Sequence, residues 1–328
     1  MSVVRGRWSV VPSSGIYSLH LSMSRYVVCI GAALIDELFY ASEMMMMRTT
    51  NNVIVKRSPG GVSRNIAHQL SLLEVPVQLI SIFGNDGDAL WLRKLCLDVG
   101  VQLDGSFNAE ERNGKYTGLI DADGSLFTAL FTNSLEHFIT PDFLEERREL
   151  LLNASYLLLD ANLPINSMEW LIAFSRHNNI PLIIEPVSVE PARKLVNIDF
   201  NGLYMVTPNE DELPAMTSAE DTESQVEELL QRGVEYVWLH RGPEGSVLYN
   251  RTQTLSLHAP KARVVDCTGA GDGSVTGFIM ARLAGLDNRD ALKTAHTLAA
   301  EILQVSGAVA SHINQAQLLQ KVSKYYTA

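Results

Sequence analysis

The sequence predicts an α/β fold in which helices flank a mostly parallel sheet and a small β-sheet lid is attached to it. Short apolar runs alternate with segments of helical periodicity along most of the chain. A glycine-rich turn near the C-terminus opens an apolar helix, and a β-rich hairpin interrupts the alternation in the first half. Together these patterns indicate one large domain over residues 26–325.

The pattern begins with residues 26–30, an apolar run that ends at Gly31 as a buried parallel strand would. Residues 58–61, Ser-Pro-Gly-Gly, are a loop signal, and a helical period follows with Ile66, Leu70 and Leu73 on one face. The next two elements are a strand at 77–83 and a helix at 89–99.

Two β-rich runs between residues 115 and 132 flank Asp121-Ala122-Asp123-Gly124, a sequence typical of hairpin turns. This hairpin does not fit the strand–helix alternation. We expect it to form a separate small sheet, a lid built from about 38–57 and 112–132.

The alternation then resumes to the end of the chain. We expect strands at 156–159, 182–184, 204–207 and 237–240, an antiparallel pair at 247–249 and 255–258, and helices at 167–177, 222–232, 273–284 and 289–305. Ligands of such sheets bind at the carboxyl ends of the strands.

Composition excludes several classes of protein. The 328 residues are 46% apolar and 19% charged, enough to form a folded core, and the net charge of −11 argues against nucleic acid or an anionic membrane as a partner. No apolar run reaches the roughly 18 residues of a membrane span. The three scattered cysteines predict neither a disulfide framework nor a metal site, so we expect a reducing cytoplasm.

Residues 1–25 differ from the rest, with three arginines, many serines and no acidic residue. Organelle transit peptides have this composition. The simpler interpretation is an extension outside the fold, which we expect to be disordered.

The strongest chemical signal is Asp266-Cys267-Thr268-Gly269-Ala270-Gly271-Asp272, which opens the helix at 273–284. Glycines at a helix start let an anion approach the free N–H groups of the first turn. A carboxylate at Asp272 would repel that anion, so its presence there needs a reason, and activation of an attacking hydroxyl is one. The structural alternative is an ordinary turn in which Asp272 is a cap.

Two further patterns stand where a ligand could bind, although a Gly-Gly loop before a helix is as often purely structural. Gly61 lets the backbone come close to a ligand, and Asn65 offers a donor and an acceptor to a diol. Asp36 stands shortly after the first strand, where an aspartate can also be a simple turn residue.

These motifs resemble the signatures of the ribokinase-like (PfkB) family of sugar and nucleoside kinases, over roughly residues 26–325. The resemblance implies that Asp272 is the catalytic base and that Gly269, Ala270 and Gly271 form the anion hole. It also implies that Asp36, Gly61 and Asn65 contact sugar hydroxyls.

The resemblance extends to the nucleotide. Asn209 and Glu212 match the Asn-x-x-Glu motif that arranges Mg²⁺ and its waters, and Mg²⁺ needs few protein ligands. Gly242 and Gly245 match a loop under ATP, and His296 falls on the helix beside the adenine. Relatives usually have a hydroxyl residue at His240. The structural alternatives are a helix start at Asn209 and Glu212, a plain turn at the loop of Gly242 and Gly245, and a surface or core histidine at His296.

Residues 306–311 follow the last long helix and resemble a monovalent-cation loop. With Asp266 and Thr268, the loop residues Gly307 and Ser311 would hold K⁺. The alternative is a helix C-cap at Gly307.

Three short segments narrow the substrate: residues 60–67, 160–162 (Asp-Ala-Asn) and 185–188 (Glu-Pro-Val-Ser) resemble pseudouridine kinases. Asn162 stands near where ribokinases usually have an acidic residue. We therefore expect ATP-dependent phosphorylation of the 5′-hydroxyl of a nucleoside, pseudouridine above others, in a homodimer that pairs through its lids. The alternatives are a ribose, fructose or adenosine kinase and a non-catalytic sugar-binding regulator. A nicotinamide dehydrogenase is disfavoured because no G-x-G-x-x-G follows the first strand.

Overall fold

The structure is a computed structural model that describes residues 9–13, 16–20, 25–132 and 134–326. Its N-terminal part contains a hairpin of β1 (Ser9–Ser13) and β2 (Ile16–His20), paired antiparallel. The disorder of residues 1–25 stays a prediction, and apart from these two strands the extension up to residue 24 lies outside the described residues.

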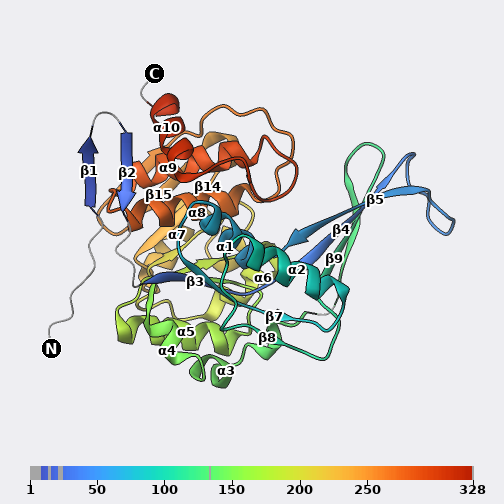
Figure 1. Ribbon diagram of the computed structural model, residues 1–328, viewed down its shortest axis with the longest axis horizontal. Coiled ribbons are helices and arrows are strands. Elements are labelled where there is room, and N and C mark those ends of the chain that lie inside the picture. The colour runs from blue at the N-terminus through green and yellow to red at the C-terminus, as the bar shows by residue number, and fades with distance from the viewer. Residues whose placement is uncertain (1–8, 14–15, 21–24, 133, 327–328) are drawn as a thin grey trace.

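An eight-stranded sheet forms the centre of the molecule (Figure 1), with the order β16-β15-β14-β13-β12-β11-β3-β6. The six strands from β14 to β6 are parallel, and β15 and β16 complete one side as an antiparallel pair. This confirms the predicted mostly parallel sheet. The strands are β3 (Tyr26–Ile30), β6 (Val77–Ile80), β11 (Ala154–Asp160), β12 (Leu182–Glu185), β13 (Met205–Val206), β14 (Tyr236–His240), β15 (Ser246–Tyr249) and β16 (Thr254–Leu257).

Side chains alternate between two cores, one on each face of this sheet. On β3, Val27 and Cys29 belong to one core, whereas Val28 and Ile30 belong to the other. A strand that is apolar on both sides needs cover on both sides.

Helices supply that cover. The first core packs under α1 (Val62–Leu72), α2 (Gly87–Asp98), α8 (Ala270–Leu283), α9 (Asn288–Ile302) and α10 (Gln315–Tyr326). The second packs under α3 (Pro141–Glu145), α4 (Arg148–Leu152), α5 (Ile165–Asn178), α6 (Val189–Ala192) and α7 (Thr222–Gln231). Within the described residues, four 3₁₀ turns connect elements: η1 (Glu136–Phe138), η2 (Arg193–Asn197), η3 (Leu213–Met216) and η4 (Gly242–Glu244). None of the described helices is both long and apolar enough to cross a membrane.

The second sheet, which we call the lid, has the order β10-β9-β4-β5 and projects from the body of the molecule (Figure 1). Its strands are β4 (Leu34–Ala41), β5 (Val53–Gly60), β9 (Lys115–Ile120) and β10 (Leu126–Thr132). The hairpin at Asp121–Gly124 is present as predicted, with Gly124 donating its N–H to the Asp121 carbonyl.

Several boundaries differ from the sequence prediction, among them the start of the lid at Leu34 rather than at about residue 38. Residues 58–60 are not a loop but the end of β5, which pairs with β4 along eight residues. Pro59 is tolerated because β5 is an edge strand of the lid, where a missing N–H costs no ladder bond. The strand expected at 77–83 breaks at Ser81, because β7 (Ile82–Phe83) leaves the central sheet to pair with β8 (Phe107–Asn108).

Candidate active site

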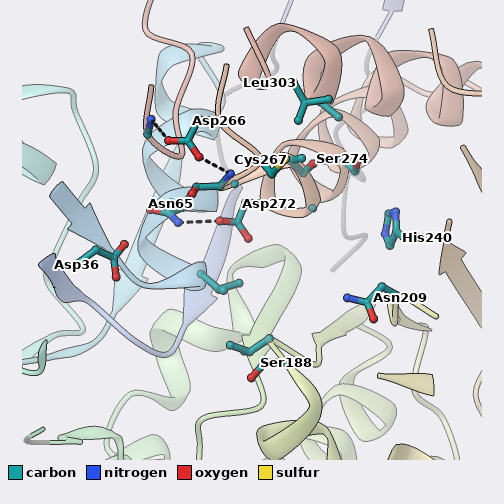
Figure 2. Close-up of a pocket in the computed structure, with 18 of the residues that line it drawn as sticks. Asp36, Asn65, Ser188, Asn209, His240, Asp266, Cys267, Asp272, Ser274 and Leu303 are labelled. Atoms are coloured by element: carbon teal, nitrogen blue, oxygen red, sulfur yellow. Dashed lines mark hydrogen bonds between the residues drawn. The ribbon is translucent and has the colours of Figure 1, made fainter. Parts of the chain in front are cut away.

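A cleft of about 1820 Å³ lies where the carboxyl ends of the central strands meet the lid. Loops after β11, β12, β13 and β14, the lid strand β4 and the start of α8 contribute to its walls. The cleft therefore occupies the edge at which parallel sheets bind ligands. Figure 2 shows Asp272 between Asp36 on one side and Asn209 and His240 on the other.

The lid turns one face toward this cleft. Asp36 pairs with Tyr116, and Tyr116 pairs with Phe131, so the three side chains share that face. Further side chains of the same rows also line the cleft: Leu38, Tyr40, Lys56, Ser58, Ile120 and Leu126. The sequence did not reveal this surface, because it arises only when strands from two separate segments pair.

Asp272 lies in the first turn of α8 and is 7% exposed. Its Oδ2 accepts a hydrogen bond of 2.7 Å from Nδ2 of Asn65 (Figure 2). Burial raises the pKa of Asp272 to about 7, while the Asn65 hydrogen bond and the Arg64 charge pull it down. A carboxylate with a pKa near neutrality suits a general base at physiological pH.

Gly269 precedes α8 in the left-handed conformation, with φ of 77°. A Cβ there would stand 2.4 Å from the carbonyl oxygen of Ala308, so only glycine fits. The N–H groups of Ala270 and Gly271 follow in the first turn, where intrahelical partners are missing. That of Ala270 makes a long hydrogen bond of 3.4 Å to the carbonyl oxygen of Cys267. Both residues line the cleft with Gly269, and an added Cβ at Gly271 would meet only open space. The three predicted anion-hole residues therefore lie together at the cleft.

On the lid side, Gly61 and Asp36 lie where the lid joins the body. Gly61 has φ of 94°, and a Cβ there would stand 2.2 Å from the carbonyl oxygen of Ala32. Burial raises the pKa of Asp36 to about 6, and the Arg64 charge opposes this shift. The structure brings Asp36, Gly61, Asn65 and Asp272 to one region of the cleft.

Asn162 lines the cleft after β11. Its backbone N–H bonds to Oδ1 of the fully buried Asp160 at 3.2 Å, and its carbonyl accepts from Nζ of Lys194 at 2.9 Å. The backbone of Asn162 is thus fixed, and its side chain is placed at the cleft.

Asn209 and Glu212 form a capping box at the turn after β13. Oδ1 of Asn209 accepts the Glu212 N–H, and Oε2 of Glu212 accepts the Asn209 N–H, each at 2.9 Å. This is the structural alternative considered for the motif, and it leaves both residues lining the cleft.

Glu185 joins this acidic wall. It is 8% exposed, and burial together with the charges of Glu212 and Asp272 raises its pKa. No group of three or more His, Cys, Asp or Glu in the described part of the chain could hold a metal ion. Oxygen donors that face one cleft but do not form a closed cage fit an ion that keeps most of its waters, as Mg²⁺ does.

The far side of the cleft contains the predicted nucleotide residues. Gly242 and Gly245 bracket η4 and line the cleft together with His240 and His296. Nε2 of His296 lies 2.8 Å from Oγ of Ser246, so His296 is a buried, hydrogen-bonded histidine that still faces the cleft. Burial and the neighbouring His296 lower the pKa of His240 to about 3, so His240 is neutral.

The predicted cation loop is only partly assembled. Asp266 accepts the N–H of Thr268 through Oδ1 and that of Gly307 through Oδ2, both at 2.9 Å, as the dashed lines in Figure 2 show. Asp266 therefore fastens the loop after α9 to the anion-hole segment. Ser311 lies in the next turn, exposed, and is not among the residues that line the cleft.

Sequence reasoning gave no role to Arg64 or Glu185, although both stood in segments noted for their resemblance. Arg64 is 1% exposed and faces Asp36 and Asp272. The sequence offered only the position of an arginine next to the Gly-Gly turn, and its burial, rare for an arginine without a partner, is visible in the structure alone.

The fold and the cleft define a class of protein: a phosphotransferase that acts on a small hydroxylated molecule. The chain matches the pfkB family of carbohydrate kinases over residues 24–315. It is 27% identical to pseudouridine kinase of Escherichia coli over 277 residues, 82% of this chain and 88% of the relative. It is 25% identical to pseudouridine kinase of Arabidopsis thaliana over 327 residues, 79% of this chain and 85% of the relative.

Solved structures agree. The Arabidopsis thaliana ribokinase complexed with ribose and ATP superposes with a TM-score of 0.82 at 22% identity, over 92% of this chain and 99% of that one. A carbohydrate kinase from Agrobacterium tumefaciens gives 0.79 at 27% identity, over 91% and 97%. This chain therefore belongs to the pfkB carbohydrate kinase family and has the ribokinase-like fold.

Proposed function

We propose that the protein transfers the γ-phosphoryl group of ATP to the 5′-hydroxyl of a ribosyl nucleoside, and that pseudouridine is this nucleoside. The acceptor oxygen forms a bond to the γ-phosphorus while the bond to the β–γ bridging oxygen breaks, which leaves ADP. Asp272 takes the hydroxyl proton. The N–H groups of residues 269–271 stabilise the charge that develops on the phosphoryl oxygens.

One observation carries this proposal: the buried Asp272 carboxylate stands between the lid-side residues and the nucleotide-side residues (Figure 2). A base at that position can reach a hydroxyl held by Asp36 and Asn65. Asn209, Glu212 and Glu185 would hold Mg²⁺ through its waters, and the ion would supply charge neutralisation beside the phosphates. Solved relatives complexed with ribose and ATP, or with ATP and Mg²⁺, support these partners.

The choice of a nucleoside rests on the size and chemistry of the lid face and on the relatives. Tyr116, Phe131 and Leu126 offer more apolar surface than a ribose needs, which suits a base. Pseudouridine has an N1–H that uridine lacks. A hydrogen-bond acceptor of the protein that pairs with this N–H would have no partner when uridine is bound. Asn162 is the polar side chain that we place in this pocket.

A phosphorylation screen with ATP and Mg²⁺ tests the proposal, using pseudouridine, uridine, adenosine, ribose and fructose as acceptors. We expect kcat/KM to be highest for pseudouridine, lower for uridine and lowest for ribose. Asn162→Ala should reduce the ratio of kcat/KM between pseudouridine and uridine. Faster turnover of ribose or adenosine than of pseudouridine would show that pseudouridine is not the preferred substrate. Nucleotide binding without turnover of any acceptor would favour a non-catalytic sugar-binding regulator.

We also propose a homodimer that pairs through the lid. β10 and β5 are the edges of the lid sheet, and β10 exposes Leu126, Phe127, Leu130 and Phe131. An exposed apolar edge is a template for strand pairing. Light scattering at about 50 µM, well above ordinary dimer constants, should give the mass of two chains, whereas the mass of one chain would refute the pairing.

A further inference from the structure

Arg64 is a fully buried cation in the first turn of α1, beside the proposed catalytic base. Its Nη2 donates to the carbonyl oxygen of Pro59 at 2.8 Å, its Nε to that of Gly60 at 3.3 Å, and Nη1 lies 3.2 Å from Nδ1 of His68. Nη2 also donates to Oδ1 of Asn65. Burial of a charge is costly unless every donor is engaged, so this arrangement needs a reason beyond packing.

The contact with Asn65 fixes which way its amide faces. A guanidinium has donors only, so the group that faces Arg64 must be the Asn65 oxygen. The Asn65 nitrogen then points the other way, where it donates to Oδ2 of Asp272 at 2.7 Å. A flipped amide would set its oxygen against the carboxylate and a nitrogen against the guanidinium, and both contacts would be repulsive.

This chain of bonds engages only one of the two carboxylate oxygens of Asp272. One carboxylate oxygen is engaged by Asn65, so the other is available to a hydroxyl in the cleft. It also changes the expectation for Asn65, because its carbonyl oxygen and one N–H are engaged by the protein. What remains for a sugar hydroxyl is the second N–H and one lone pair.

Charges around the site agree with this geometry. The carboxylates of Asp36 on β4 and Asp160 on β11 raise the pKa of Asp272, and Asp272 raises the pKa of Glu185 on β12. Arg64 is the cation among the charged groups that act on Asp272, and it lowers the pKa of both Asp272 and Asp36. His68 does not add a charge, since burial and Arg64 lower its pKa to about 4.

We propose that Arg64 is a positioning residue for phosphoryl transfer: it orients the Asn65 amide, which in turn orients the Asp272 carboxylate toward the acceptor hydroxyl. The inference rests on the catalytic role proposed for Asp272. Arg64 itself does not line the cleft and touches no reactant.

The test compares two variants. Arg64→Met keeps a long side chain and loses the charge, whereas Arg64→Lys keeps the charge and loses the forked donor geometry of the guanidinium. Arg64→Met should lower kcat about tenfold to a hundredfold, less than the 10²–10⁴ of a base itself, with KM for ATP little changed. The acid limb of kcat/KM against pH should move to higher pH, because the neighbouring positive charge is gone. Arg64→Lys should keep the limb near its original pH and lose part of kcat.

Arg232→Met is the matched control. Arg232 is a half-buried arginine that donates to the carbonyl oxygens of Met216 and Ile198, and it lies outside the cleft. We expect this variant to melt at a lower temperature with kcat and pH profile unchanged. A purely structural role for Arg64 would give the same result.

A double-mutant cycle shows whether Arg64 acts through Asn65. Arg64→Met should add little to the loss of kcat in Asn65→Ala, since the orientation it supplies is already absent. Additive losses, or wild-type kcat and acid limb in a folded Arg64→Met or Arg64→Lys protein, would overturn the inference. Asp272→Asn measured in parallel separates the two proposals: if it retains activity, the proposed base is wrong, whatever Arg64 does.

Discussion

The central sheet and the lid are both β-sheets at the walls of one cleft, but they bury their residues differently. In β3 and β12 nearly every side chain is inaccessible, whereas six of the seven residues of β10 are exposed. The central sheet is stabilised by its own two cores, and the polar groups at its carboxyl edge are bonded to one another. The lid has no second layer, so its apolar face is available to a ligand or a partner chain. Stability and recognition are thus assigned to different sheets.

Asp272→Asn should give the largest effect at the central-sheet side of the cleft. The amide has the shape of the carboxylate and cannot take a proton, so kcat should fall by about 10²–10⁴ while the fold is kept. Steady-state kinetics and melting temperature measured on the same samples check this. Turnover within about threefold of the wild type, against that range for a base, would remove Asp272 from the mechanism.

Leu158→Ala and Leu130→Ala compare the two sheets directly. Leu158 on β11 is 0% exposed and Leu130 on β10 is 59% exposed. The first should destabilise the protein by about 2–5 kcal/mol through lost burial and a cavity. The second should change the free energy of unfolding by less than about 0.5 kcal/mol. Denaturant titrations measure both, and equal losses would show that the lid has a core of its own.

Activity should fall in acid because the base must be ionised. With the Asp272 pKa raised to about 7, kcat/KM should drop about tenfold for each pH unit below that value. The stability of the fold depends on pH in the opposite direction. The pKa of Asp272 in the folded protein lies above the ordinary 3.8, so this group contributes stability in acid that is lost as pH rises through about 7. Asp272→Asn should therefore melt above the wild type at pH 8, with the gap closing toward pH 5. A gap that does not depend on pH would contradict this.

The smallest effect concerns K⁺, which we propose to act through Asp266, Thr268 and the 306–311 loop. Because Gly269 packs on Ala308, a cation that steadies this loop should steady the anion hole. We expect rates in K⁺ about fivefold above those in Na⁺ at constant ionic strength, at the low end of typical couplings between sites. Equal rates in K⁺ and Na⁺ would indicate that the loop serves only as a helix C-cap.

Much of this architecture could be predicted because it follows local rules. The strand–helix alternation, the hairpin at Asp121–Gly124 and the helix that Gly269 opens all depend on residues close in sequence. The course of β5 was missed because Pro59 and two glycines indicate a loop, and only the pairing with β4 makes residues 58–60 a strand.

The site was predictable residue by residue but not as a network. Asn65 and Asp272 were each expected at the cleft, yet they are 207 residues apart, and nothing local predicts that they bond. The same holds for Arg64, whose role depends on a contact between α1 and α8. The lid face escaped prediction because it combines strands from two segments of the chain.

Asp36 belongs to the lid, whereas Asn65 and Asp272 belong to the body. An acceptor that contacts all three is therefore a cross-link between the lid and the body, in addition to the chain connections and the ion pairs of Arg57 and Lys115 with Asp88 on α2. The dissociation constant measured for such an acceptor includes the free energy of setting the spacing between the sheets, in addition to the contacts themselves. An analogue that lacks the hydroxyls for Asp36 forfeits both contributions at once.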